Sequence, residues 1–198
     1  MKLYYLKGAC SLATKISLLE AGQEFEAFAV DRATKRTADG KDFNAINPKG
    51  YVPALVLDSG EVLSENVAVL AYVASLDKSG RLGPAPGTEG CYRLLEWLAY
   101  INSEVHKNFS PLFRPTTGED AKATAREMIA RRLAFIEQRL GDRPYLLGEN
   151  FSVADAYLYV VLGWRERAGV DISQFPKLIA FYERCHARPS AQKARQSE

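Results

Sequence analysis

The sequence has few of the residues that build metal sites and disulfide frameworks. Its 198 residues include three cysteines, Cys10, Cys91 and Cys185, and two histidines, His106 and His186. The cysteines are odd in number and widely spaced, which argues against a disulfide scaffold and favours a reducing compartment. No group of cysteines and histidines has the spacing of metal ligands, so we predict no metal site.

Long apolar runs and an excess of one charge are also missing. No stretch is apolar for the length that spans a bilayer, and no charged start followed by an apolar run marks a signal peptide. We therefore expect a cytoplasmic protein with no membrane contact. The 26 basic and 24 acidic residues leave a formal net charge of +2 and are mixed along most of the chain. This balance argues against a nucleic-acid partner.

The composition is that of a soluble globular protein, with 47% hydrophobic and 25% charged residues. Residues 78–88 contain three glycines and two prolines, which predicts a linker between two units, 1–77 and 89–198. Strand patterns occur before this linker and disappear after it. The expected architecture is a small α/β domain followed by an all-helical domain.

The first unit reads β-α-β-(short helix)-β-β-α, a four-stranded sheet covered by helices. The expected strands cover residues 3–6, 25–31, 54–57 and 61–63, and a helical turn is expected over 41–46. A helix between the first two strands predicts that they are parallel. Ser64 is the expected N-cap of the last helix, with Glu65 in its first turn.

The second unit shows apolar residues at helical spacing throughout. The first helix is expected within 89–113, ending near Ser110-Pro111, and further helices over 119–140, 152 to about 168, and about 176–187. Ser152 and Asp155 form a capping box. Pro189 is expected to end the last helix, followed by a frayed polar tail whose basic residues are solvated.

Cys10 stands where the first strand gives way to the first helix. Unpaired helix N–H groups and the helix dipole favour an anion there, so Cys10 can have a depressed pKa, or the same donors can hold another molecule's thiolate. Most free cysteines are small buried hydrophobic residues, and this alternative stays open.

A peptide-binding groove is the functional interpretation of three further stretches. The Val52 backbone, beside Pro53 at a strand entrance, can pair with an extended peptide. Glu65 and Asn66 begin a helix whose free N–H groups suit a carboxylate. Each has a structural alternative: Val52 as core, Glu65 serving the helix dipole, Asn66 as a first-turn residue.

Two residues outside the predicted groove have both a functional and a purely structural interpretation. Lys35 is a solvated loop charge unless a ligand carboxylate lies near it. His106 is either a donor facing the thiol site or a surface histidine, and spacing alone favours the surface. Glu104 and Lys107, one helical turn apart, suggest an exposed ion pair.

These stretches resemble the beta class of bacterial glutathione S-transferases. The matching segments are MKLYY…GACSL (1–12), NPKGYVPAL (47–55), SEN (64–66), EWL…SEVHK…SPLF (96–113) and FSVADAYL (151–158). They extend over essentially the whole chain, and Cys10 with SEVHK is the class-specific signal.

The resemblance implies a thioredoxin-like N-terminal domain, an all-helical C-terminal domain, a homodimer and a cis Pro53. Glutathione is the implied co-substrate, and the helical domain is expected to hold a small hydrophobic electrophile. The residues implied for the site are Cys10, Ser11 and His106 at the glutathione sulfur, Lys35 at the glycyl carboxylate, Val52 at the cysteinyl backbone, Glu65 and Asn66 at the γ-glutamyl end, and Ser103 and Glu104 from the helical domain, Glu104 in one version from across the dimer.

Three positions depart from the family pattern. Lys15 replaces a frequent histidine, Ala99 a frequent asparagine, and Ser64-Glu65-Asn66 the usual Thr-Glu-Gly. Ala99 removes a possible polar contact to glutathione, and Asn66 adds a side chain beside the γ-glutamyl site.

The leading hypothesis is a glutathione transferase that conjugates the glutathione thiolate to small electrophiles. A second hypothesis makes Cys10 the nucleophile of a monothiol disulfide reductase, dehalogenase or peroxidase, with glutathione resolving the mixed disulfide. A third is a non-catalytic, transferase-like binding protein. Retained conjugation but lost disulfide reduction in a Cys10→Ala variant would separate the first two, and failure to bind glutathione would favour the third.

Overall fold

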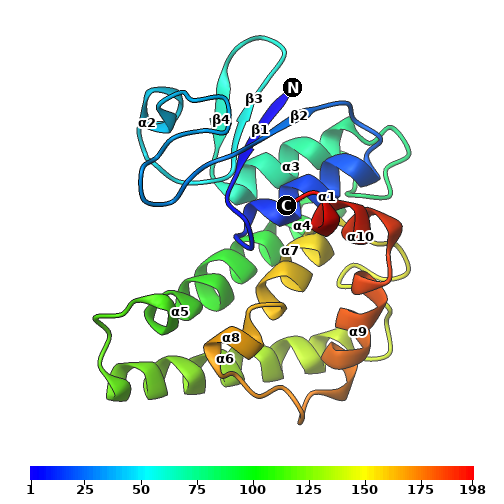
Figure 1. Ribbon diagram of the computed structural model, residues 1–198. Coiled ribbons are helices and arrows are strands. Elements are labelled where there is room, and N and C mark those ends of the chain that lie inside the picture. The colour runs from blue at the N-terminus through cyan, green and yellow to red at the C-terminus, as the bar shows by residue number, and fades with distance from the viewer.

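A four-stranded sheet forms the centre of the N-terminal unit in the computed structural model, which describes residues 1–198 (Figure 1). The strands are β1 (Lys2–Tyr5), β2 (Glu26–Ala29), β3 (Ala54–Val56) and β4 (Val62–Ser64), in the order β2-β1-β3-β4. β1 pairs with β2 in parallel, as predicted from the intervening helix, and the other pairs are antiparallel. The helices of this unit are α1 (Ser11–Glu20), α2 (Phe43–Ile46) and α3 (Asn66–Leu76).

Alternation along β1 explains how both faces of the sheet are covered. Leu3 and Tyr5 pack with residues of α1 and α3, including Leu18 and Val73. Tyr4 points to the other face and packs against Phe43 of α2. The strand therefore belongs to two apolar clusters, which hold the turn that follows it in place.

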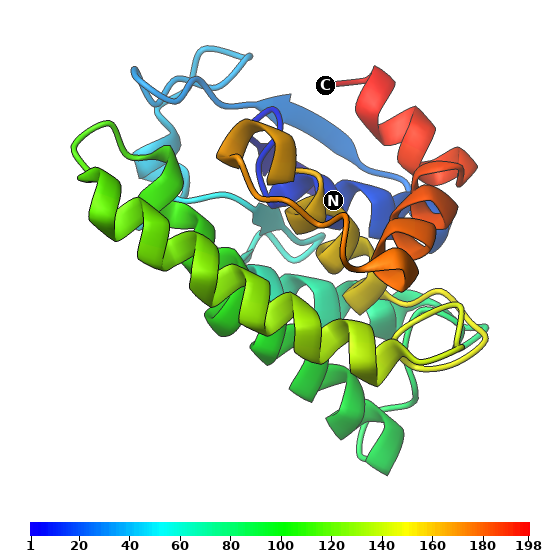
Figure 2. The same cartoon turned by 90° about the horizontal axis from the view of Figure 1, so that it is seen from below.

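The C-terminal unit is entirely helical. Its segments are α4 (Glu89–Tyr100), a π-helical stretch (Ile101–His106), α5 (Lys107–Phe109), a 3₁₀ turn (Ser110–Phe113), α6 (Glu119–Leu140), α7 (Val153–Leu162), α8 (Arg165–Ala168), α9 (Pro176–His186) and α10 (Pro189–Gln196). The long α6 lies alongside α4 and α5 (Figure 2). Every residue of α7 is buried, and α7 packs on α1, which joins the two units. None of the helices combines the length and the apolar character that crossing a membrane would require.

The predicted capping box opens α7. The Asp155 carboxylate is fully buried and accepts hydrogen bonds from the backbone N–H groups of Leu146 and Ser152, each at 2.8 Å. Burial raises the pKa of Asp155 to about 6, although these donors act in the opposite direction. The carboxylate thus fixes both the helix start and the loop before it.

Two boundary predictions were wrong. Ser64 is the last residue of β4 rather than an N-cap, and Glu65 stands at the N-cap of α3 with φ 70°. The single helix expected from residue 89 onward is interrupted by the π-helical stretch at Ile101–His106. Its expected end near Ser110-Pro111 is confirmed, since Pro111 has no N–H to continue the α-helix beyond Phe109.

The expected frayed tail is instead α10, which lies beside α1 (Figure 1). Ala191 and Ala194 are buried against the rest of the fold. Arg188 forms a bidentate pair with Glu20 at the end of α1, with N–O distances of 2.7 and 2.8 Å. Its basic neighbourhood suggested a solvated surface charge, and this prediction for Arg188 was wrong.

Candidate functional site

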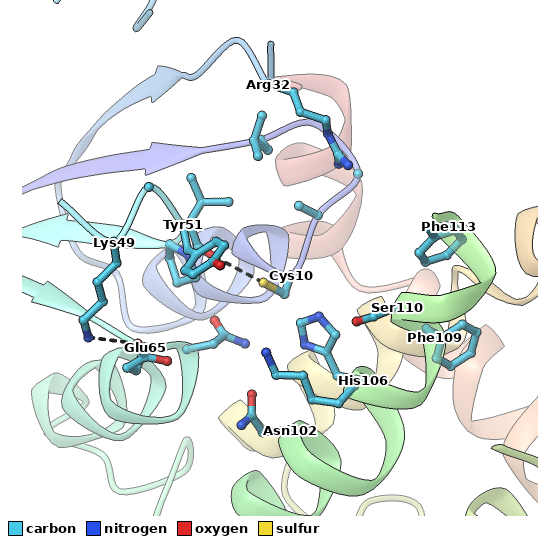
Figure 3. Close-up of a pocket in the computed structure, with 18 of the residues that line it drawn as sticks. Cys10, Arg32, Lys49, Tyr51, Glu65, Asn102, His106, Phe109, Ser110 and Phe113 are labelled. Carbon is cyan, nitrogen blue, oxygen red and sulfur yellow. Dashed lines mark hydrogen bonds and ion pairs between the residues drawn. The ribbon is translucent and has the colours of Figure 1, made fainter. Parts of the chain in front are cut away.

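An open cavity of about 460 Å³ lies between the two units (Figure 3). It is bounded by the β1–α1 turn, the loops before α2 and β3, the start of α3, residues 102–114 and α8. The predicted site residues that line it are Cys10, Lys35, Val52, Pro53, Glu65, Asn66 and His106. Figure 3 shows Lys49 and Glu65 toward one end, Phe109 and Phe113 toward the other, and Cys10 and His106 between them.

Cys10 is the N-cap of α1 and is only 9% exposed. Its thiol donates to the Val52 carbonyl oxygen, with an S–O distance of 3.5 Å. Burial raises the pKa of Cys10 to about 11, although its own backbone N–H and that of Ser11 lower it. The predicted depressed pKa is therefore wrong for the protein without ligand, because desolvation of the thiolate outweighs the helix N–H groups.

Ser11 does not present its hydroxyl to the cavity. The side chain is fully buried, accepts from the Leu6 N–H at 3.2 Å and donates to the Leu6 carbonyl at 3.3 Å. The hydroxyl holds the turn after β1, and this contradicts its predicted role as a donor to a bound sulfur. The Ser11 backbone N–H, which faces the Cys10 sulfur, is the donor that remains.

Val52 presents its backbone to the cavity. The Val52–Pro53 peptide bond is cis, as the resemblance implies. The Val52 carbonyl receives the Cys10 thiol, whereas the Val52 N–H has no hydrogen-bond partner. An unpaired N–H beside an open cavity is available to a ligand's backbone carbonyl.

Lys35 and Glu65 are the two non-glycine residues with positive φ, 56° and 70°, and both line the cavity. The Lys35 ammonium donates to the Gly50 carbonyl at 3.1 Å. The Glu65 carboxylate accepts from the Lys49 ammonium at 2.9 Å. Such backbone conformations are uncommon outside glycine and concentrate at ligand clamps.

Asn66 follows Glu65 at the first position of α3 and is 6% exposed. Its side-chain oxygen accepts from the Thr14 hydroxyl of α1 at 3.2 Å. This bond ties the beginning of α3 to the helix that begins at Cys10. Asn66 therefore supports the site as well as lining it.

His106 is a partly buried cavity residue, so the surface position favoured by spacing alone was wrong. Burial, with a smaller effect of the Lys107 charge, lowers its pKa to about 4, and the imidazole is neutral at pH 7. Its Nδ1 lies 2.7 Å from the hydroxyl of the fully buried Tyr157, and that hydroxyl donates to Asn102 Oδ1 at 3.0 Å. Neither Tyr157 nor Asn102 was predicted from the sequence to be part of the site.

The single hydroxyl proton of Tyr157 sets the histidine tautomer. With the Asn102 oxygen toward Tyr157, His106 carries its proton on Nδ1, and Nε2 is an acceptor. If the Asn102 amide turns its nitrogen to Tyr157, the tyrosine proton goes to Nδ1 and Nε2–H becomes a donor. The donor role implied for His106 thus depends on the orientation of Asn102.

Ser103 and Glu104 do not line this cavity. Ser103 is exposed and donates to the Ala99 carbonyl, and Glu104 pairs with Arg132 at 2.8 Å rather than with Lys107. Their predicted contribution is therefore contradicted within one chain, since the π-helical stretch turns Asn102 and His106 inward instead. A contribution of Glu104 across a dimer stays a prediction.

Two departures from the family pattern lie away from the cavity. Ala99 is exposed and does not line it. Lys15 is 3% exposed, and its ammonium donates to the Ser197 carbonyl at 2.8 Å and lies 4.4 Å from the Tyr5 ring centroid. Lys15 therefore anchors the end of the chain to α1.

Aromatic residues of the helical unit close the far end of the cavity. Phe109, Phe113 and Trp164 contact one another, with ring centroids 5.7 to 6.2 Å apart. The Trp164 indole N–H donates to the Gly8 carbonyl at 3.0 Å, which connects this cluster to the β1–α1 turn. Spacing could not assign these rings, because they come from segments about 50 residues apart.

Comparisons with known proteins agree with this geometry. Residues 1–75 match the model of the glutathione S-transferase N-terminal domain, and residues 94–189 that of its C-terminal domain. The chain is 41% identical over 198 residues to glutathione S-transferase GstA of Escherichia coli O157:H7, covering 100% of this chain and 98% of the relative.

Two solved structures are similar over the whole chain. A sphingomonad glutathione S-transferase complexed with glutathione has a TM-score of 0.96 at 46% identity. A beta-class glutathione S-transferase of Sphingomonas chungbukensis has a TM-score of 0.95 at 44% identity. Each comparison covers 100% of this chain and 98% of the other chain. The resemblance and the fold class drawn from the sequence are confirmed.

Proposed function

Since the chain belongs to the glutathione S-transferase family, we propose that it joins the thiolate of glutathione to small electrophiles in the cavity between its two units. One observation carries the proposal. Cys10, Val52, Glu65 and His106, far apart in the chain, share a cavity with charged groups at one end and aromatic rings at the other. In this proposal residues 1–77 bind glutathione, 78–88 form the linker, and 89–198 supply the electrophile pocket.

The charged end suits an extended tripeptide with two carboxylates and one ammonium group. The free Val52 N–H would pair with its central residue. Lys35 would meet the glycyl carboxylate. Glu65 would receive the γ-glutamyl ammonium, while the unpaired N–H groups at the start of α3, beginning with Asn66, would hold the neighbouring carboxylate.

The glutathione sulfur would lie between Cys10 and His106. Backbone N–H groups at the start of α1, together with the cationic lining, would favour its thiolate. His106, with a pKa of about 4, accepts or donates a hydrogen bond but does not retain the thiol proton at pH 7, so that proton leaves to solvent. The thiolate then attacks the electrophile, a C–S bond forms, and the leaving group departs with its bonding electrons.

Use of Cys10 as the nucleophile is less favoured. That route requires a Cys10 thiolate, whereas burial raises its pKa to about 11. In our proposal the Cys10 thiol donates a hydrogen bond, to Val52 without ligand and to the glutathione sulfur when it is bound. A protein that only bound glutathione would not need the aromatic end of the cavity, where the proposal places the electrophile.

The proposal includes a homodimer in the cytoplasm. Tyr92 of α4 and Phe135 of α6 are exposed aromatic side chains, at 63% and 43%, and a second copy of the chain would cover them. The three cysteines form no disulfide, in keeping with a reducing compartment. Light scattering on the purified protein gives its molar mass and tests the dimer directly.

Calorimetric titration with glutathione tests the site. A Glu65→Gln variant should bind about 10-fold to 100-fold more weakly, since a hydrogen bond to a charged group contributes about 1.5–3 kcal/mol. Glu61→Gln is the matched control, because Glu61 is an exposed glutamate of the same unit outside the cavity. Equal affinity of both variants, or no conjugation of 1-chloro-2,4-dinitrobenzene by the wild type, would contradict the proposal.

A further inference from the structure

The cavity carries far more positive than negative charge. Its lining includes one acidic residue, Glu65, and six cationic ones: Arg32, Lys35, Lys49, Lys107, Arg114 and Arg167. Lys49 is neutralised by Glu65, and Lys35 binds the Gly50 carbonyl. The other four cations form no ion pair.

Two of the unpaired cations border the aromatic cluster of Phe109, Phe113 and Trp164. Arg114 directly follows Phe113, and the Arg167 guanidinium lies 4.4 Å from the Phe113 ring centroid. Lys107 follows His106 in the chain and also lines the cavity. Figure 3 shows Phe109 and Phe113 at the end of the cavity that faces away from Lys49 and Glu65. With Arg114 and Arg167 beside Phe113, this end is both aromatic and cationic.

This combination defines the chemistry of a second ligand. Aromatic rings in offset or edge contact attract another flat ring. A guanidinium without a carboxylate partner binds an anionic group, with two parallel N–H bonds where the group is a carboxylate. The carboxylates of glutathione are placed at the opposite end by the proposed function, so they do not neutralise Arg114 and Arg167.

We infer that the electrophile is an aromatic compound bearing a carboxylate or a similar anion, its ring on the Phe109, Phe113 and Trp164 cluster and its anion at Arg114 and Arg167. The inference rests on the proposed function and narrows its substrate class. The reaction needs no further reagent: the glutathione sulfur bonds to an activated ring carbon, and a halide leaves with the bonding electron pair. The positive end also raises the local concentration of an anionic substrate.

A matched pair of substrates tests the inference. One is 4-chloro-3,5-dinitrobenzoate, and the other is its methyl ester, which keeps the ring and leaving group but has no charge. For each compound, kcat/KM at saturating glutathione is divided by the rate constant of its uncatalysed reaction with glutathione at the same pH. This division removes the difference in intrinsic reactivity. The acid should exceed the ester by about fivefold or more, as expected for contacts with two exposed arginines.

Variants assign that preference to the two arginines. Arg114→Gln and Arg167→Gln should each lower the acid-to-ester ratio about two- to fivefold. Arg131→Gln should leave the ratio unchanged, because Arg131 is an exposed, unpaired arginine of α6 outside the cavity. The preference should also shrink as salt is raised, since exposed charges are screened.

Three results would overturn the inference. The ester could match or exceed the acid, the arginine variants could lower both substrates equally, or Arg131→Gln could act like them. In each case glutathione conjugation itself persists, so the proposed function survives. Failure of the wild type to conjugate either compound would instead refute the proposed function, and the inference with it.

Discussion

The raised pKa of Cys10 leads to a quantitative prediction for its reactivity. With a pKa of about 11, only about one Cys10 in 10,000 is a thiolate at pH 7, against about 3% for a cysteine of ordinary pKa 8.5. Because alkylation proceeds through the thiolate, Cys10 should react with iodoacetamide at least about 100-fold more slowly than an ordinary exposed cysteine.

Peptide mass spectrometry measures alkylation at each of the three cysteines as a function of pH. Steric shielding lowers the rate at every pH, whereas a raised pKa makes the Cys10 rate climb tenfold per pH unit without levelling off below about pH 10. Cys91, half-buried, serves as the reactive control and Cys185, buried and with a raised pKa, as the silent one. A Cys10 rate that reaches a plateau below pH 8 would refute the reasoning and restore Cys10 as a candidate nucleophile.

Three further predictions concern the buried polar contacts. Tyr157→Phe removes the hydroxyl that lies between His106 and Asn102. The free energy of unfolding in urea should fall by about 1–3 kcal/mol and kcat should fall as well, whereas unchanged values would show that the hydroxyl does not position His106. Between pH 7 and pH 5 a histidine in the unfolded chain takes up a proton, whereas folded His106, with a pKa of about 4, does not. This group should therefore lower the free energy of unfolding by about 2 kcal/mol over that range. A His106→Gln variant whose stability fell as much over the same pH range would contradict this. Glu20→Gln should cost about 1.5–3 kcal/mol by breaking the pair with Arg188. Glu24→Gln is the comparison, because Glu24 is an exposed glutamate of the same unit; equal melting of both variants would argue against an anchoring role.

The elements that sequence analysis identified correctly have local signals. Alternation over the first strand, the helical spacing that begins at Leu12, and the pairing of Ser152 with Asp155 each depend on neighbours within a few residues. The order of these segments then implied a parallel first pair of strands, because a helix connects them. These features could be predicted because each pattern refers to a single element.

The wrong predictions arose where the same residue type is compatible with two different structural roles. Pro189 was expected to end the fourth helix and to be followed by a frayed tail. The helix α9 does end at His186, but the tail is α10, because proline is equally suited to the first turn of a new helix. The spacing of Ala191 and Ala194 was a usable signal, since both face inward. Cys10 was taken to gain from helix N–H groups, whereas its burial decides the direction of the pKa shift.

Local signals placed Cys10, Val52, Glu65 and Asn66 in a groove, and the family resemblance supplied the remaining predicted site residues. Nothing in the sequence marks the π-helical stretch that brings Asn102 rather than Ser103 to the cavity. Tyr157 reaches His106 across 51 residues, and Arg167 reaches Phe113 across a similar distance. Such contacts depend on how helices pack, which periodicity does not determine.

A crystal structure of the protein with glutathione is the most direct test of the central claim. The account predicts the tripeptide extended along Val52, its γ-glutamyl end at Glu65, and its sulfur within hydrogen-bonding distance of Cys10 and His106. Glutathione bound elsewhere on the chain, or bound in this cavity with its sulfur directed away from Cys10, would contradict it.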